Sequence, residues 1–403
     1  MISMHTSPLE QPGTGDAGGM NVYLLQVAKR LASLGVQTEI FTRATTRALP
    51  PLVEADPGVW VHHVSAGPYE DLEKRSLIGQ VSAFARELLR NQSGQERGQY
   101  DLVHSHYWLS GQIGAMVKKH WRIPLVHTMH TMAKVKNTLL ARGDRPEPEE
   151  RIRGEESVVG AADRLIANTT EEAEQLTTLY QAEPADVQVV RPGVNLEVFR
   201  PRDRHAARRR LGVPEDAIVL TFAGRIQPLK GPDVLLRAVA RLVSDHPELA
   251  DRLLVPIIGG ASGSGDYDPV GLAQRLGIGS MVRFVGPQPQ TALARWMQAS
   301  TLVAVPSYNE SFGLVALEAQ ACGTPVVATA TGGLKIAVAD GVSGILVPGH
   351  APTDWARAIE DLVSRPQLRT RLSIGARRHA RQFGWSSTAE ATLDVYRSLI
   401  DRA

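Results

Sequence analysis

Three features that are scarce or missing set the first limits on what this chain does. It has one cysteine, Cys322, in 403 residues, so no internal disulfide bond can form, which is typical of a reducing compartment. No stretch reaches the roughly 20 uninterrupted apolar residues that a membrane helix needs. The first residues, Met-Ile-Ser-Met-His, lack the basic-then-apolar layout of a secretory signal. We therefore expect a cytoplasmic protein that does not insert into a membrane.

An excess of one charge is also missing. Lys and Arg number 44 while Asp and Glu number 42, so the composition gives no support to a protein that coats nucleic acid. A locally basic site is still compatible with this balance. Cys322 lies in an apolar, alanine-rich stretch typical of a helix, and we interpret it as a small buried side chain rather than a nucleophile. With 43% apolar residues, the chain is long enough for two cores.

Short apolar runs alternate with longer runs of helical period, a pattern that indicates α/β architecture with parallel sheets. In the first half the expected strands are Met1–Met4, Val36–Phe41, Val59–Val64, Leu102–His104, Leu125–Thr128 and Arg164–Ala167, and the expected helices are Asn21–Leu34 and Ser76–Arg90. After a proline-punctuated linker at Val190–Pro201, the second half has expected strands at Ile218–Phe222, Leu254–Ile258, Val282–Phe284, Leu302–Val305 and Val326–Ala328, and helices at Val234–Val243 and Leu314–Ala321. Two similar series predict two similar domains with a cleft between them.

The first motif that could carry chemistry is a G-x-G-x-x-G sequence from Gly13 to Gly18, which opens a helix. Glu39 follows about 20 residues later, the spacing of a dinucleotide-binding fingerprint. However, the loop Thr6–Pro12 separates the motif from its strand, and Asp16 stands where a pyrophosphate would bind. We prefer a helix N-terminus at which glycines let the backbone approach an anion such as phosphate. A turn without a ligand also stays open.

The second motif places Arg225 and Lys230 on the loop after the expected strand Ile218–Phe222. Two cations at the carboxyl end of a strand could hold a diphosphate and stabilise the negative charge that a departing diphosphate acquires. Solvated surface cations are the alternative.

The third motif is an E-x7-E element from Glu310 to Glu318. If the helix begins near Phe312, Glu318 lies about two turns into it, where a carboxylate can accept two hydrogen bonds from a vicinal diol such as a ribose. Glu310, on the preceding loop, could reach a sugar hydroxyl, and Gly332-Gly333 offers a further close approach of the backbone. Two ordinary surface acids would not explain the surrounding Pro-Ser-Tyr-Asn-Glu-Ser-Phe-Gly sequence.

Together these motifs resemble a known family. The Arg225/Lys230 pair, the E-x7-E element and Gly-Thr-Pro-Val-Val from Gly323 are similar to the retaining glycosyltransferases of family 4, over the whole C-terminal half. The N-terminal half resembles the D-inositol-3-phosphate glycosyltransferases of mycothiol biosynthesis, and the likeness runs through nearly the full chain. The sequences that carry it are Met-Ile-Ser-Met-His-Thr-Ser-Pro, Gly-Asp-Ala-Gly-Gly-Met-Asn, Ala-Gly-Pro-Tyr, His-Ser-His-Tyr-Trp and His-Thr-Met-His-Thr.

The resemblance implies a GT-B fold, in which two Rossmann-like domains with parallel sheets face each other across a cleft. The acceptor-binding domain would span residues 1–195, completed by a C-terminal helix at 385–403, and the UDP-sugar-binding domain would span 196–384. The implied reaction moves N-acetylglucosamine from UDP-GlcNAc to 1D-myo-inositol 3-phosphate with retention. The resemblance implies a front-face mechanism, in which the leaving phosphate takes the acceptor proton, so that no protein nucleophile and no cofactor would be required.

The resemblance also implies roles for individual residues. Expected donor-binding residues are Gln11, Pro12, Gly19, Arg225, Lys230, Gln288, Glu310 and Glu318, with Gln288 by the uracil and Glu318 by the ribose. Expected acceptor-binding residues are His5, Asp16, Ala17, Gly18, Gly19, Met20, Asn21, Lys74, Tyr107, Thr131 and Arg151. The catalytic group would be His130, Arg225, Lys230 and Glu310, with His130 bonding the donor sugar or the transferring centre rather than acting as a general base. A structural magnesium ion is implied near Met297, Gln298, Ser300 and Thr324, through backbone oxygens only, because their side chains are poor ligands.

Other interpretations remain. A family 4 enzyme could use another acceptor, either of the sucrose-phosphate type or a lipid-linked inositol. A nicotinamide-dependent oxidoreductase would use the Gly13–Gly18 loop, and a non-catalytic sensor would bind the sugar nucleotide without turnover. The sequence leaves the oligomeric state open, a homodimer included.

Overall fold

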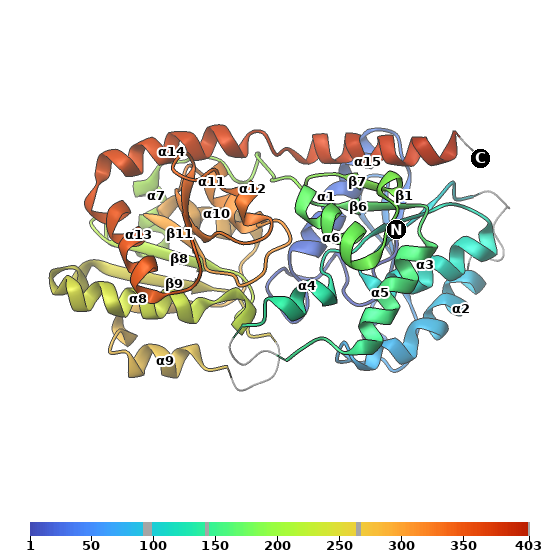
Figure 1. Ribbon diagram of the computed structural model, residues 1–403, viewed down its shortest axis with the longest axis horizontal. Coiled ribbons are helices and arrows are strands. Elements are labelled where there is room, and N and C mark those ends of the chain that lie inside the picture. Colours follow the sequence, from blue (N-terminus) through green and yellow to red (C-terminus); the bar gives the residue numbers. More distant parts are fainter. Residues whose placement is uncertain (92–98, 142–144, 263–266, 402–403) are drawn as a thin grey trace.

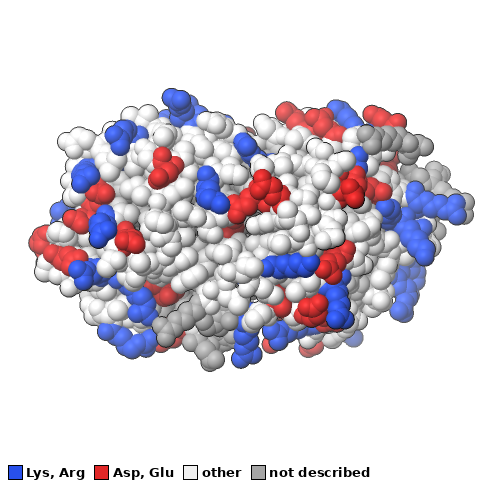
Figure 2. Space-filling view, in the orientation of Figure 1, with Lys and Arg blue, Asp and Glu red and all other residues white. Residues whose placement is uncertain are grey.

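Two β-sheets, one in each half of the chain, organise the computed structural model into two lobes, each with helices around its sheet (Figure 1). The structure describes residues 1–91, 99–141, 145–262 and 267–401. The α/β prediction is confirmed. On the face that Figure 2 shows, basic and acidic side chains intermingle over both lobes. Among the described residues, no helix is long and apolar enough to cross a membrane.

The first lobe is built on strands in the order β2-β3-β1 and β4-β5-β6-β7. Its strands are β1 (Thr38–Arg43), β2 (Leu52–Asp56), β3 (Val59–Val64), β4 (Val103–His106), β5 (Leu125–Thr128), β6 (Arg164–Ala167) and β7 (Val187–Val189). Its helices are α1 (Gly19–Ser33), α2 (Val81–Asn91), α3 (Trp108–Trp121), α4 (Ala133–Thr138), α5 (Glu149–Ala161) and α6 (Thr170–Tyr180), and the short 3-10 turn Ser76–Gln80 precedes α2.

The expected first strand, Met1–Met4, is reduced to a single residue. Ile2 forms isolated parallel bridges to Phe41 of β1 and to Ser105 of β4, so it joins the two groups of strands. The expectation of parallel sheets is wrong for β2, which pairs antiparallel with β3. The connection is the two-residue turn Pro57-Gly58, with Gly58 at φ +76°, and so tight a turn can only reverse the chain.

The second lobe has a parallel sheet in the order β10-β9-β8-β11-β12-β13. Its strands are β8 (Ile218–Ala223), β9 (Leu253–Ile258), β10 (Val282–Val285), β11 (Leu302–Val305), β12 (Val326–Thr329) and β13 (Gly344–Val347). Its helices are α7 (Arg204–Leu211), α8 (Pro232–Asp245), α9 (Pro269–Arg275), α10 (Gln290–Ala299), α11 (Leu314–Ala321), α12 (Leu334–Ala337), α13 (Pro352–Ser364) and α14 (Pro366–Ala380). The strand order reverses between β8 and β11, and ligands of such sheets bind at the carboxyl ends of the strands on either side of that point.

The chain crosses between the lobes twice, and the two crossings run side by side. Val194 forms a bridge to Gly384 and donates its N–H to the carbonyl of Phe383 at 2.8 Å. A Cβ on Gly193 would lie 2.5 Å from the backbone nitrogen of Trp385, so only glycine fits at this contact. The last helix, α15 (Trp385–Ile400), then lies on the first lobe, in line with α14 along the top of Figure 1.

A shared core ties α15 to α1. Trp385, Val395 and Tyr396 pack in one buried cluster with Tyr23 and Val27 of α1. The helix expected at 385–403 therefore packs on the first lobe. Residues 402 and 403 of the expected segment lie outside the described residues.

Candidate active site

Loops from the carboxyl ends of both sheets meet between the lobes. The amide of Gln11 donates to the carbonyl of Gln288 at 2.7 Å, and the N–H of Gly260 donates to the carbonyl of Gly13 at 2.9 Å. The hydroxyl of Ser311 donates to the carbonyl of His130. The Gly13–Gly19 loop, the β5 loop and the E-x7-E element, which lie far apart in the sequence, are therefore neighbours.

Asn21 shapes the glycine-rich loop. Its side chain is 1% exposed; Oδ1 accepts from the N–H of Gly18 at 2.9 Å, and Nδ2 donates to Thr6 Oγ1 at 2.7 Å and to the Ser7 carbonyl at 2.6 Å. These contacts occupy both ends of the amide, so Asn21 positions the loop. Ala17 is fully buried beneath it, and Met20 is partly buried against the first-lobe core.

Asp16 joins the two lobes electrostatically. Its carboxylate lies 2.7 Å from Lys74 Nζ in the first lobe and 3.6 Å from Arg225 Nη1 in the second. A Cβ on Gly18 would come 3.6 Å from Arg225 Nε, so the start of α1 also lies against this guanidinium. The carboxylate thus neutralises two cations that a phosphate could otherwise bind.

Tyr107 is the centre of a second group of predicted residues. The guanidinium of Arg151 lies 5.0 Å from its ring centroid and Lys74 Nζ lies 6.0 Å from it, while the ring of His5 packs on it at 4.3 Å between centroids. Arg151 donates to Thr131 Oγ1 at 2.9 Å. The four residues expected around the inositol phosphate, and His5 expected on the inositol, are therefore adjacent.

Carboxylates fix Arg151 in place. This 4% exposed side chain pairs with Glu147 at 2.9 Å and with Glu155 at 2.7 Å. Sequence reasoning missed these two partners of Arg151, because nothing marks Glu147 and Glu155 apart from the other acids of a charged segment. Nδ1 of His5 is buried without a hydrogen-bond partner among the described residues.

His130 sits in the loop after β5 in the left-handed region, with φ +60°. Its Nε2 shares a hydrogen bond of 3.0 Å with Nδ1 of His106, a residue that the sequence analysis did not single out. Burial lowers the pKa of His130 to about 3, so its ring is neutral near pH 7. A neutral imidazole can bond a hydroxyl or a polarised oxygen.

The second-lobe residues form a matching group. Lys230 Nζ lies 2.6 Å from Glu310 Oε2, which also accepts from the hydroxyl of Ser307 at 3.1 Å. The backbone at Gly332-Gly333 makes the expected close approach, and it does so to the backbone of Glu310. A Cβ on Gly332 would lie 2.4 Å from the Glu310 carbonyl oxygen. The N–H of Gly333 donates to the same carbonyl at 2.8 Å. These glycines hold the loop that carries Glu310.

Glu318 lies in α11, which begins at Leu314, so it is about one turn into the helix rather than two. The residue is 7% exposed, and burial raises the pKa of its carboxyl to about 8. A carboxyl held so far from water is unusual outside ligand-binding sites. Gln11 and Pro12 lie beside the Gln288 loop, since the Gln11 amide contacts the carbonyls of both Pro12 and Gln288.

The oxygens around the expected magnesium position bond to the protein itself. The carbonyl of Met297 accepts from Thr324 Oγ1 at 2.6 Å and from the N–H of Ser300 at 3.2 Å. The hydroxyl of Ser300 donates to the Trp296 carbonyl, and the amide of Gln298 donates to the Arg200 carbonyl. The Met297 carbonyl, one of the backbone oxygens that could face an ion, therefore already accepts two hydrogen bonds. The ion stays a prediction, and no chemical step is assigned to it.

Comparisons with known proteins identify the family. A family described as "Glycosyl transferases group 1" matches residues 203–379, and one described as "Glycosyl transferase 4-like domain" matches residues 18–193. A D-inositol 3-phosphate glycosyltransferase of a Nocardioides species is 62% identical over 98% of this chain and 89% of its own length. The protein of the same name from Kribbella flavida is 59% identical over 99% of this chain and 95% of its own.

Solved structures confirm the expected fold. A sucrose-phosphate synthase from Thermosynechococcus elongatus superposes with a TM-score of 0.89 at 29% identity, covering 100% of this chain and 98% of that one. HepE of Anabaena, solved with UDP-glucose, gives a TM-score of 0.78 at 22% identity over 97% of this chain and 98% of its own, and shows the fold alone. The two lobes are therefore the two Rossmann-like domains of a GT-B glycosyltransferase.

The raised pKa of Glu318 makes a prediction about stability. Folding takes up a proton at this carboxyl between its ordinary pKa of 4.5 and the folded value of about 8, so its contribution to stability is lost as the pH rises through that window. Glu318→Gln lacks this titration. We expect the melting temperature of the variant to rise relative to wild type between pH 5 and pH 8.5, as measured by differential scanning fluorimetry.

Glu390→Gln, which removes an exposed carboxyl on α15, is the matched control and should show a constant offset from wild type. The same constant offset for Glu318→Gln at every pH would mean that the Glu318 carboxyl is ionised in the folded protein at neutral pH.

Proposed function

The chain belongs to the family of D-inositol 3-phosphate glycosyltransferases, and from that premise we propose that it moves N-acetylglucosamine from UDP-GlcNAc to 1D-myo-inositol 3-phosphate. The transfer retains the configuration of the anomeric carbon and releases UDP. In this proposal the protein acts in the cytoplasm on the first step of mycothiol biosynthesis. Its partners are these two small molecules.

The proposal rests on one observation: cations of the two lobes lie on either side of a single carboxylate, that of Asp16. Lys74 and Arg151 flank Tyr107 in the first lobe, and Arg225 faces them from the second lobe through Asp16. A reaction between a nucleotide diphosphate and a phosphorylated acceptor needs two phosphate sites this close, because the transferred sugar must touch both molecules.

On the donor side, Arg225 and Lys230 bind the diphosphate. In the protein without ligand, each has an acidic partner, Asp16 and Glu310 respectively, which holds its side chain near the position where the diphosphate will lie. When the bond from the sugar to the phosphate breaks, negative charge grows on the leaving UDP, and these cations stabilise it. Glu318 binds the ribose diol, and Glu310 binds hydroxyls of the donor sugar.

On the acceptor side, Lys74 and Arg151 neutralise the inositol phosphate while Tyr107 and Thr131 supply hydroxyls. His5 then lies next to the inositol ring, where the unpaired Nδ1 can bond one of its hydroxyls. The phosphate replaces Asp16 as the partner of Lys74. A sugar without a phosphate makes no charge-assisted hydrogen bonds to Lys74 and Arg151, so the site favours phosphorylated acceptors.

The reaction itself needs no protein nucleophile. The acceptor hydroxyl attacks the anomeric carbon from the side on which UDP leaves: the carbon–oxygen bond to phosphate breaks, the bond to inositol forms, and the acceptor proton moves to the departing phosphate oxygen. His130, neutral and held by His106, bonds the donor sugar and orients it. Contact between the lobes excludes water, so the donor is transferred rather than hydrolysed.

Product analysis tests the proposal directly. Purified protein with UDP-GlcNAc and inositol 3-phosphate should form a GlcNAc-inositol phosphate, detected by mass spectrometry, with an α-linkage by NMR coupling constants. Parallel reactions use free inositol, fructose 6-phosphate as the acceptor of a sucrose-phosphate-type enzyme, and UDP-glucose as donor. Turnover of fructose 6-phosphate but not inositol 3-phosphate would discard the acceptor and keep the glycosyltransferase.

Lys74 provides the sharper test of the acceptor site. Lys74→Gln removes one charged contact to the acceptor phosphate, so we expect the KM for inositol 3-phosphate to rise about 10- to 100-fold. The KM for UDP-GlcNAc should stay within about threefold, as measured by steady-state UDP release.

Lys119→Gln on α3, an exposed lysine, is the matched control and should change neither constant. Equal increases of both KM values for Lys74→Gln would show that the acceptor phosphate does not bind at Lys74.

A further inference from the structure

A second pocket lies in the C-terminal lobe, at the opposite edge of the sheet from the candidate active site. Its walls include Ala217 and Ile218 at the start of β8 and Thr301 just before β11, whereas Arg225 follows the end of β8. The length of β8, six residues, separates the two edges by roughly 20 Å. The pocket encloses about 550 Å³, which is within the range of roughly 300–1,000 Å³ seen for small-molecule sites.

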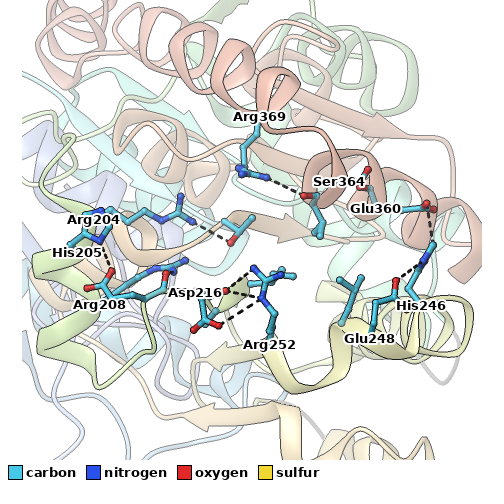
Figure 3. Close-up of a pocket in the computed structure, with 16 residues that line it drawn as sticks. Arg204, His205, Arg208, Asp216, His246, Glu248, Arg252, Glu360, Ser364 and Arg369 are labelled. Atoms are coloured by element: carbon cyan, nitrogen blue, oxygen red, sulfur yellow. Dashed lines mark hydrogen bonds and ion pairs between the residues drawn. The ribbon is translucent and has the colours of Figure 1, made fainter.

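Three arginines gather at one end of this pocket. Figure 3 shows Arg204 and Arg208, from α7, side by side, with Arg369 reaching in from α14. Arg208 is 4% exposed, and its guanidinium donates to the backbone carbonyls of Ala299, Pro214 and Glu215. Arg369 donates to the carbonyls of Leu362 and Val363. Backbone contacts therefore hold two of the three arginines in place.

None of the three has a carboxylate partner among the residues that the structure describes. The acids of the same pocket pair elsewhere: Glu215 with His205, Asp216 with Arg252, and both Glu248 and Glu360 with His246. In Figure 3 the His246 group lies at the end of the pocket away from Arg204. Glu215 attracts Arg204, and Glu215 and Asp216 attract Arg208, but neither acid forms an ion pair with any of the three arginines. The pocket thus has an end rich in arginine and an opposite end with the carboxylates of Glu248 and Glu360.

At the arginine-rich end, Arg204 is destabilised by burial and by repulsion from its two cationic neighbours. Arg204 donates to Thr301 Oγ1 at 3.2 Å, but its Nε is buried without a partner among the described residues. Burial, and then repulsion from Arg208 and Arg369, lowers the pKa of Arg204 from 12.5 to about 10. An anion bound among these three side chains removes that repulsion and supplies charge-assisted hydrogen bonds.

We propose that this pocket is a second binding site, for a phosphorylated sugar or polyol. The phosphate binds among Arg204, Arg208 and Arg369, whose planar donors match its oxygens. The hydroxyl groups of the same molecule extend toward Glu248 and Glu360, which can accept their hydrogen bonds. A bare phosphate ion would fill only part of the volume and leave those acids uncontacted.

Isothermal titration calorimetry with glucose 6-phosphate tests this site on the whole protein, with UDP present to fill the donor site. We expect binding by wild type, at least tenfold weaker binding by Arg204→Gln/Arg369→Gln, and unchanged binding by Lys74→Gln, in which the active-site phosphate contact is removed. The double variant Arg371→Gln/Arg378→Gln, which removes two exposed charges from α14, is the matched control and should bind as wild type does.

Two further titrants define the ligand class. Glucose should not bind, and inorganic phosphate should bind at least tenfold more weakly than glucose 6-phosphate. The proposal is overturned if wild type does not bind glucose 6-phosphate, if Lys74→Gln abolishes the binding, or if inorganic phosphate binds equally well. Because the wild-type measurement alone can overturn it, the test does not depend on the folding of the double variant.

Discussion

The ion pairs of Asp16 with Lys74 and Arg225 are the contact on which the rest of the site depends. A site for two phosphorylated molecules must gather cations, and gathered cations repel one another when the ligands are absent. Asp16 relieves that repulsion at the junction of the lobes, and Glu310 does the same for Lys230. The carboxylates therefore keep the cations close together, and in the proposed reaction phosphate oxygens take their place.

The two sheets explain why these groups meet. In the second lobe the strand order reverses between β8 and β11, and Arg225 and Glu310 follow the carboxyl ends of those strands. In the first lobe the strand order reverses between Ile2 and β4. Tyr107 directly follows the end of β4. Both crevices open toward the junction of the lobes. The last helix, α15, returns to pack on α1, so the C-terminal end of the chain belongs to the first lobe.

Much of the fold could be predicted because buried parallel strands are continuous apolar runs: Leu125–Thr128, Arg164–Ala167 and Leu302–Val305 have the predicted bounds. The β2 strand was missed because it is a half-exposed edge strand with no such run. Motif chemistry singled out Arg225, Lys230 and Glu310. It could not show that the Asn21 side chain forms hydrogen bonds to its own loop. The carboxylates around Arg151 and the arginines of the second pocket depend on contacts between distant segments, which no local pattern records.

A crystal structure with UDP and inositol 3-phosphate bound tests the central claim most directly. The account predicts that diphosphate oxygens contact Arg225 and Lys230, that the inositol phosphate contacts Lys74, Thr131 and Arg151, and that Asp16 and Glu310 no longer pair with the cations. A diphosphate bound elsewhere, with the Asp16–Arg225 and Lys230–Glu310 pairs intact, would contradict it.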